Sequence, residues 1–325
     1  AGSGADNQKV AAAVQAGDPP DVWIDNRPAF QLDQLGLLQD VTHLQDEVIA
    51  KYGEPAARPK NELLGKDGYV GVALHARSDG GWARSDLFEA AGIDVHEIRQ
   101  FDELRDACLE VSDPDNEMFG WGITINQSGD GSWFINRVIQ GFGGSWQDES
   151  GELVTIDSPE TVDAVNWIID TYTNEKWAPM LPPGILAWTD IANNEAFLGE
   201  KIAYTQNAGS VYAKAVADGL PVKDVTIYHK PVGGPAIQEY IGLGGMYEHL
   251  ITGAHNAQGG SDLILSFHDD EVMQGMFATA LSYAVPCYEP QWDYDIVQSD
   301  PINLQLQEAA LDPSGWTGPG WPGPI

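Results

Sequence analysis

Basic residues are scarce in this chain of 325 residues: 16 Lys and Arg stand against 49 Asp and Glu, for a formal net charge of -33. Nucleic acids and anionic lipid surfaces are bound through clustered Lys and Arg, so this balance argues against both as partners. A net charge so far from zero also keeps a protein soluble and apart from its own copies. We therefore expect a monomer that does not bind nucleic acid.

Long apolar runs and cysteines are also scarce. The sequence has no apolar stretch of about 18 residues, the length that a membrane-spanning helix needs. It does not begin with a basic segment and an apolar stretch, so we expect any secretion signal to have been removed or to have been left out of this sequence. Cys108 lies on the apolar side of a predicted helix, which favours a small buried side chain. Whether it pairs with Cys287, far away in the sequence, stays open.

Motifs for catalysis, phosphate binding or metal binding are missing. We find no Walker-type loop, no G-x-S-x-G and no H-E-x-x-H. Asp113, Asp115 and Glu117 alternate as in a calcium loop, but Met118 stands where the sharp turn needs glycine. The acidic residues at 269–270 are explained more simply as a helix cap than as metal ligands. We therefore expect no catalytic residue, no metal and no cofactor.

Strand and helix patterns alternate along the chain, and its length fits two domains. The clearest helix start is Ser158 as N-cap, Pro159 in the first turn and Glu160 at the positive end of the helix dipole. This order predicts an α/β protein with largely parallel sheets. Further helices are predicted at 7–16, 101–111, 190–199, 261–268 and 271–279, and strands at 21–24, 69–74, 120–125, 201–205 and 225–228.

Aromatic residues are plentiful: 11 Trp and 11 Tyr are present, and several lie in loops rich in Gly, Asn and Asp. Sugar rings and polyols pack their C–H faces on aromatic planes, while their hydroxyls need planar donors and acceptors. A single Trp is more often part of a core than a ligand contact. The pattern as a whole nevertheless favours a carbohydrate or polyol ligand.

Several segments, in order along the chain, resemble family 1 of the extracellular solute-binding proteins. These are the carbohydrate-binding receptors of ABC importers, similar to maltose- and glucose-binding proteins. The most distinctive segments are Ala-Gly-Asp-Pro-Pro-Asp-Val-Trp at 16–23 and Trp-Ala-Arg-Ser-Asp-Leu-Phe-Glu-Ala-Ala-Gly-Ile at 82–93. The matching segments together are 11–23, 36–41, 68–72, 82–93, 101–104, 143–144, 157–160 and 194–203.

The resemblance implies a two-lobe, type II periplasmic-binding-protein fold whose lobes are discontinuous in sequence and joined by hinge crossings. Carried onto this chain, lobe I comprises 1–122 plus 243–298 and lobe II comprises 123–242 plus 299–325. The crossings fall near 120–123 and 241–243, with a third somewhere after Glu289. Compared with the family pattern, we expect that segments at both ends of the chain are missing.

The function implied is capture of a sugar or polyol in the cleft between the lobes and delivery to the permease subunits of an ABC importer. We expect a mono- or disaccharide or a polyol as ligand, no enzymatic activity, and an extracytoplasmic location, periplasmic or lipid-anchored at the cell surface. Two alternatives stay open. One is a glycoside hydrolase or lyase with a Trp-lined carboxylate cleft, and the other is a sensor or adhesin built on the same fold.

Candidate ligand contacts follow from the resemblance. Trp133 stands where maltose-binding relatives carry a stacking aromatic, whereas Trp82 is interpreted as core. The loop at 207–212 lacks the Trp usual in the family, which favours a small ligand. The full set of predicted contacts is Asp25, Asn26, His75, Asp130, Ser132, Trp133, Trp188, Asn207, Ser210, Tyr212, Gly245, Met246, Tyr247 and Tyr283.

Overall fold

The computed structural model describes residues 4–26, 29–148, 153–238 and 243–311 of the chain. These residues divide into two compact units. Unit 1 contains Ala1–Ser78 and Leu243–Asp312, and unit 2 contains Asp79–Gly242. The boundaries differ from the expected lobes, because residues 79–122 fall in unit 2 and the described residues after 298 fall in unit 1. The chain passes between the units within one long strand, β2 (Val72–Arg84), at Ser78–Asp79.

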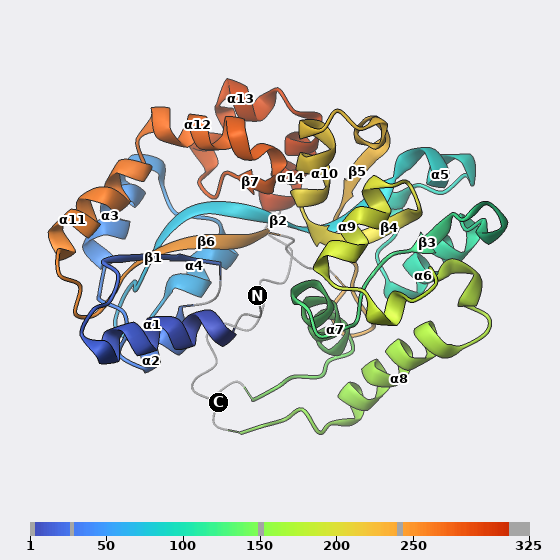
Figure 1. The fold of residues 1–325 in the computed structure, drawn as a ribbon, viewed down its shortest axis with the longest axis horizontal. Coiled ribbons are helices and arrows are strands. Elements are labelled where there is room, and N and C mark those ends of the chain that lie inside the picture. Colours follow the sequence, from blue (N-terminus) through green and yellow to red (C-terminus); the bar gives the residue numbers. More distant parts are fainter. Residues whose placement is uncertain (1–3, 27–28, 149–152, 239–242, 312–325) are drawn as a thin grey trace. The chain divides into compact units, whose positions relative to one another are not determined.

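Unit 1 combines helices with a small sheet to which β2 contributes its first half. The other elements of unit 1 are α1 (Gly4–Ala16), β1 (Val22–Asp25), α2 (Phe30–Gln34), α3 (Thr42–Tyr52), α4 (Ala57–Leu63), β6 (Leu243–Leu250), α11 (Ala257–Phe267), α12 (Asp270–Ala280), η6 (Leu281–Tyr283), β7 (Ala284–Val285), η7 (Glu289–Asp293), α13 (Asp295–Gln298) and α14 (Pro301–Leu311). In Figure 1 the sheet lies between α3, α11 and α12 on one side and α1, α2 and α4 on the other.

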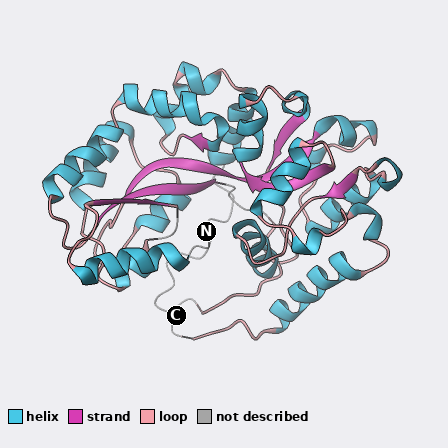
Figure 2. Cartoon of the chain, in the orientation of Figure 1, coloured by secondary structure: helices cyan, strands magenta, loops and turns pink. Residues whose placement is uncertain are grey.

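Unit 2 has the same kind of construction, with helices packed on a second small sheet (Figure 2). The helices α6, α7, α9 and α10 contact its strands. Its elements are α5 (Ser85–Ala90), η1 (Val95–Glu97), α6 (Phe101–Glu110), η2 (Pro114–Asn116), β3 (Phe119–Trp121), α7 (Gly129–Gly141), α8 (Pro159–Thr173), η3 (Ala178–Met180), η4 (Ile185–Ala187), α9 (Asp190–Leu198), β4 (Ile202–Ala208), α10 (Ser210–Ala217), η5 (Pro221–Val225) and β5 (Thr226–His229).

The sheets are mostly antiparallel, so the prediction of largely parallel sheets is wrong. In unit 1, β6 pairs antiparallel with β1 and with β2, and β7 pairs antiparallel with β2. In unit 2, β4 and β5 pair antiparallel with β2, whereas β3 and β4 are parallel. Alternating strands and helices favour parallel pairs where a helical crossover brings successive strands side by side, as for β3 and β4. Here β1 pairs with β6, which comes from the far end of the chain.

Local signals place the helices more reliably than the strands. Ser158 caps α8 as predicted, since its Oγ accepts a hydrogen bond from the backbone N–H of Thr161 at 3.2 Å. The strand predicted at 69–74 instead begins at Val72 and continues to Arg84. The strand predicted at 120–125 ends at Trp121, and α7 begins at Gly129.

Trp82 and Cys108 are both fully buried, as predicted. Cys108 belongs to the apolar core of unit 2, and both cysteines of the chain are free thiols. At Gly120, on β3, a Cβ atom would lie 1.8 Å from the carbonyl oxygen of Cys108, so the close approach of α6 to β3 requires glycine. No helix in the described ranges is long and apolar enough to cross a membrane.

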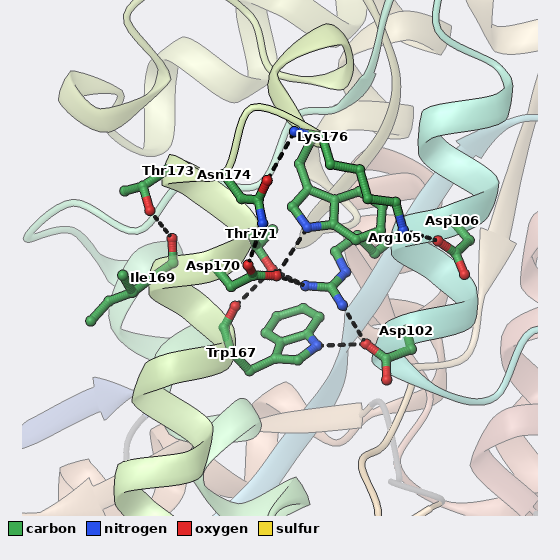
Figure 3. Close-up of polar contacts among 11 residues, drawn as sticks. Asp102, Arg105, Asp106, Trp167, Ile169, Asp170, Thr171, Thr173, Asn174 and Lys176 are labelled. Carbon is green, nitrogen blue, oxygen red and sulfur yellow. Dashed lines mark hydrogen bonds and ion pairs between the residues drawn. The ribbon is translucent and has the colours of Figure 1, made fainter.

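A cation between two tryptophan rings joins α6 to α8 in unit 2. The guanidinium of Arg105 lies 4.8 Å from the ring centroid of Trp167 and 4.1 Å from that of Trp177. The same group bonds to the carboxylates of Asp102, at 2.7 Å, and Asp170, at 3.0 Å (Figure 3). This arrangement pairs a largely buried cation with two carboxylates and fixes the packing of two helices, so it has a structural role.

Strand β6 is buried on both faces. Tyr247 points to the side of α4, where its hydroxyl donates to Glu62, and Glu248 points to the α11–α12 turn. Nε2 of His268, in that turn, lies 2.9 Å from the Glu248 carboxylate. Both members of this pair are buried, and burial raises the pKa of Glu248.

Candidate functional site

The most connected group of predicted contacts lies in unit 2, at the beginning of α7. Ser128 is the N-cap of this helix, and its Oγ accepts from the backbone N–H of Gly131 at 3.1 Å. The preceding two amides, of Gly129 and Asp130, donate to the carboxylate of Asp190 at 3.1 and 2.9 Å. A carboxylate is favoured there because the first amides of a helix carry partial positive charge. Helix α9 thus caps α7.

Helix α9 also holds the side chain of Asp130. Asn193, which is 0% exposed, donates from Nδ2 to the Asp130 carboxylate at 2.9 Å. Its Oδ1 accepts from the backbone N–H of Asn194 at 2.9 Å, so both ends of this amide are engaged. The Asp130 side chain is half-buried. The result is a carboxylate at the surface of unit 2 whose orientation is set from beneath by a buried donor.

The segment after β4 joins the same network. The Asn207 amide donates to Oδ1 of Asn194, and its own Oδ1 accepts from the Ser210 hydroxyl at 3.3 Å. The Asn207 carbonyl accepts from Nε1 of the buried Trp82 at 3.1 Å, which anchors the backbone at this point. The structure therefore brings Asp130, Asn207 and Ser210 into one polar network within unit 2.

The predicted aromatic contacts of unit 2 differ in exposure. Trp133, on α7, is half-buried, with the Arg137 guanidinium 4.4 Å from its ring centroid. Trp188 is half-buried against the apolar core, and Ser132 is exposed. Tyr212 is buried and stacks on Trp82, with centroids 6.0 Å apart and planes at 5°. Its ring therefore belongs to the packing around Trp82.

In unit 1, predicted contacts lie together on β1, β2 and β6. Asp25 is opposite Tyr247 across the β1–β6 pair, and Tyr247 is in turn opposite Ala73 of β2. The Asp25 carboxylate accepts from the backbone N–H of Asn26 at 2.7 Å. With its amide oriented to satisfy both neighbours, Asn26 donates to Asp25 and accepts from Arg77. The end of β1 thus carries a linked acid, amide and cation.

The other predicted contacts of unit 1 are mostly turned inward. Burial lowers the pKa of His75 to about 4, so its ring is neutral, and Nδ1 donates to the Ala76 carbonyl at 2.8 Å. Gly245 leaves space for the ring of Tyr247, which a Cβ atom would approach to 2.1 Å. Met246 and Tyr283 are half-buried.

Asp190, Asn193 and Asn194 were missed as site residues in the sequence. The helix predicted at 190–199 does begin at Asp190, but Thr189 makes no side-chain cap hydrogen bond there, and the Asp190 carboxylate caps α7. A signal was present, because consecutive Asn residues are unfavourable within a helix unless their side chains have another role.

The part of the chain covered by the structure contains no group of three His, Cys, Asp or Glu residues suited to a metal ion. Asp269 stands at the N-cap of α12 but makes no side-chain cap bond there. Asp270, in the first turn, accepts from the hydroxyls of Tyr52 at 2.6 Å and Tyr294 at 2.7 Å. Of the two acidic residues, Asp270 therefore links α12 to neighbouring aromatics.

Comparison with known proteins defines the class of this molecule. The model of the bacterial extracellular solute-binding protein family matches residues 1–266, and the chain belongs to that family. It is 26% identical over 175 residues to the maltotriose-binding protein of Pyrococcus abyssi, covering 53% of this chain and 35% of that protein. It is 25% identical over 183 residues to the arabinooligosaccharide-binding protein of Halalkalibacterium halodurans, covering 55% and 39%. The chain thus spans little more than a third of these curated relatives.

Solved structures support the fold over nearly the whole chain. T. maritima MalE3 with bound maltose aligns with a TM-score of 0.76 at 20% identity, covering 96% of this chain and 79% of that one. A solute-binding protein of an ABC transporter from Agrobacterium radiobacter K84, in complex with ribitol, also aligns with a TM-score of 0.76, at 17% identity, covering 94% and 77%. The predicted type II binding-protein fold is thereby confirmed.

Proposed function

We propose that the chain is the receptor of an ABC importer and binds a sugar or polyol outside the cytoplasm, in the periplasm or anchored at the cell surface. The relatives with maltotriose, arabinooligosaccharide, maltose and ribitol in their names support this ligand class. Permease subunits are the proposed partners, and a monomer is the proposed state of the free protein, in keeping with its net charge of -33.

The observation that carries this proposal is the polar network of unit 2 beside Trp133. Asp130 and Ser210 are half-buried and offer a carboxylate and a hydroxyl, which are partners that sugar hydroxyls need, and the buried Asn207 holds Ser210 in place. Trp133 lies three positions after Asp130 on the same helix, and its half-buried ring suits the apolar face of a sugar. In unit 1 we propose Asp25, Asn26, Met246 and Tyr283 as further contacts.

The carboxylates of this network favour binding over hydrolysis. A glycosidase needs one carboxyl group that gives up a proton and another that attacks or activates water. Asp190 instead accepts from two backbone amides, and Asp130 accepts from the buried Asn193. Both carboxylates are thus hydrogen-bond acceptors, whereas hydrolysis needs one carboxyl group that donates a proton. We therefore propose that the chain has no enzymatic activity.

Thermal unfolding of the purified chain against maltose, maltotriose, arabinose oligosaccharides, ribitol, amino acids and organic acids tests the proposal. We expect one sugar or polyol to raise the Tm by several degrees, since a ligand at a hundred times its Kd adds about 2.7 kcal/mol of stability. Trp133→Ala should abolish most of that shift, whereas Trp133→Phe should retain part of it. A shift from amino acids or acids alone would overturn the ligand class, and release of reducing sugar would overturn the binding-only function.

A further inference from the structure

Two carboxylates of unit 2, those of Asp130 and Asp190, bond to groups at or beside the beginning of α7. Asp190 occupies the amides of Gly129 and Asp130, and the side chain of Asp130 lies beside Asn193. The first amides of a helix are a favourable place for an anionic group of a ligand. Here a carboxylate of the chain itself takes that place, so an incoming anion would have to displace Asp190 and approach Asp130.

The buried Asn193 determines how Asp130 is presented. Because its Oδ1 accepts from the backbone of Asn194, its Nδ2 is directed at the Asp130 carboxylate. Rotation of this amide would break both hydrogen bonds inside unit 2, where Asn193 is 0% exposed. The neighbouring Asn194 bonds to Asn207, so consecutive residues of α9 position both parts of the network.

We propose that Asp190 and Asn193 are positioning residues that set ligand specificity: they fix the Asp130 carboxylate toward ligand hydroxyls and fill the α7 N-terminus with negative charge. Unit 2 then accepts a neutral polyhydroxy ligand and rejects its anionic counterpart. An anionic ligand would be repelled by the carboxylates of Asp130 and Asp190, and the backbone N–H groups that could bind it already donate to Asp190. This inference rests on the proposed function and adds the charge of the ligand to it.

Matched neutral and anionic probes test the role of Asp190. Glucose with glucuronate, galactose with galacturonate, and ribitol with ribonate are titrated calorimetrically into the wild-type chain and into Asp190→Asn. We expect the wild type to prefer the neutral member of a pair. Asp190→Asn keeps the shape and one acceptor oxygen but removes the charge. The ratio of the affinity for the neutral probe to that for the anionic probe should therefore fall at least tenfold. An unchanged preference in Asp190→Asn, or a wild type that prefers the anion, overturns the inference.

Exchanging the side chains of Asp130 and Asn193 distinguishes an effect on ligand affinity from an effect on stability. Asn193→Asp alone places two carboxylates at hydrogen-bond distance and should lower the Tm. Combining it with Asp130→Asn restores an amide–carboxylate pair but moves the charge away from the surface. We expect the double variant to regain Tm, while its affinity for the neutral probe stays about tenfold to a hundredfold below wild type. If the double variant regained both the wild-type Tm and the wild-type affinity, the hydrogen bond between positions 130 and 193 would matter only for structure, and the inference would be overturned.

The outcomes also separate this inference from the proposed function. A wild-type chain that binds no probe in any pair, and no sugar in the wider panel, overturns the proposed function and with it the inference. A wild-type chain that binds a neutral probe, together with an Asp190→Asn variant of unchanged preference, overturns the inference alone.

Discussion

In unit 1, neighbouring polar side chains on β6 are directed into the two faces of the sheet, Tyr247 toward Glu62 and Glu248 toward His268. In unit 2, the polar side chains Asp130 and Ser210 belong to the first turns of α7 and α10 and are half-buried; Asp130 bonds to Asn193 and Ser210 bonds to Asn207. Strand residues of a covered sheet have apolar layers on both sides, whereas helix starts lie at the edge of the fold.

This difference decides what a polar residue does in each unit. A buried polar pair on a covered strand contributes to folding, because losing one partner leaves the other without hydrogen bonds in an apolar environment. A half-buried group at a helix start keeps part of its surface for a ligand. Substitutions of the buried Tyr247 and Glu248 on β6 should therefore change stability, and those in the network around Asp130 should change ligand affinity.

The largest effect is expected for Glu248→Leu. Removing the carboxylate leaves Nε2 of His268 without its partner in a buried environment, and breaking a buried pair in this way costs about 3 kcal/mol of unfolding free energy. Urea denaturation followed by fluorescence measures the loss. The ligand-induced Tm shift should remain.

Glu248→Gln is the matched control for this pair. Its amide oxygen still accepts from His268, and burial already raises the pKa of Glu248, so a neutral side chain suits the site. The expected change is within about 1 kcal/mol. If Glu248→Leu proved as stable as the wild type, buried polar pairs would not support unit 1 and the contrast with unit 2 would fail.

The fold was predictable where short-range signals decide. Ser158 and Pro159 define the start of α8 through interactions within one turn, and Gly199 ends α9 as predicted. The pairing of β1 with β6 depends on residues more than 200 positions apart, which no local pattern reveals. The same limit explains why Asp190 was missed: its amide partners lie on another helix, 60 or so positions earlier.

Acid sensitivity gives the next largest effect and should be alike in the two units. Burial lowers the pKa of His75 in unit 1 and of His229 in unit 2 to about 4. Each folded pKa lies below the unfolded value of about 6.5, so the unfolded state binds protons first as the pH falls. The stability from each neutral ring is complete above pH 6.5 and is lost as the pH falls toward 4.

Urea midpoints of the wild type, His75→Gln and His229→Gln at pH 6.5 and 5 check this prediction. Each histidine should account for about 1.5 kcal/mol of the loss between these values, and each substitution should remove its share. Glu248 acts in the opposite direction, because its raised pKa adds stability as the pH falls. Equal pH dependence in all three chains would mean that neither ring is held neutral by burial.

The smallest effect, and the sharpest test of the contrast, is expected for Tyr247→Phe. The hydroxyl of Tyr247 is buried and donates to Glu62, so its removal should cost about 1 kcal/mol of stability. Because this group is directed at α4, affinity for the best neutral sugar should stay within about twofold. Tyr283→Phe is the matched control, since Tyr283 is half-buried in the same unit and is a proposed ligand contact. Here affinity should fall while stability holds, and the reverse pattern would place Tyr247, not Tyr283, at the ligand.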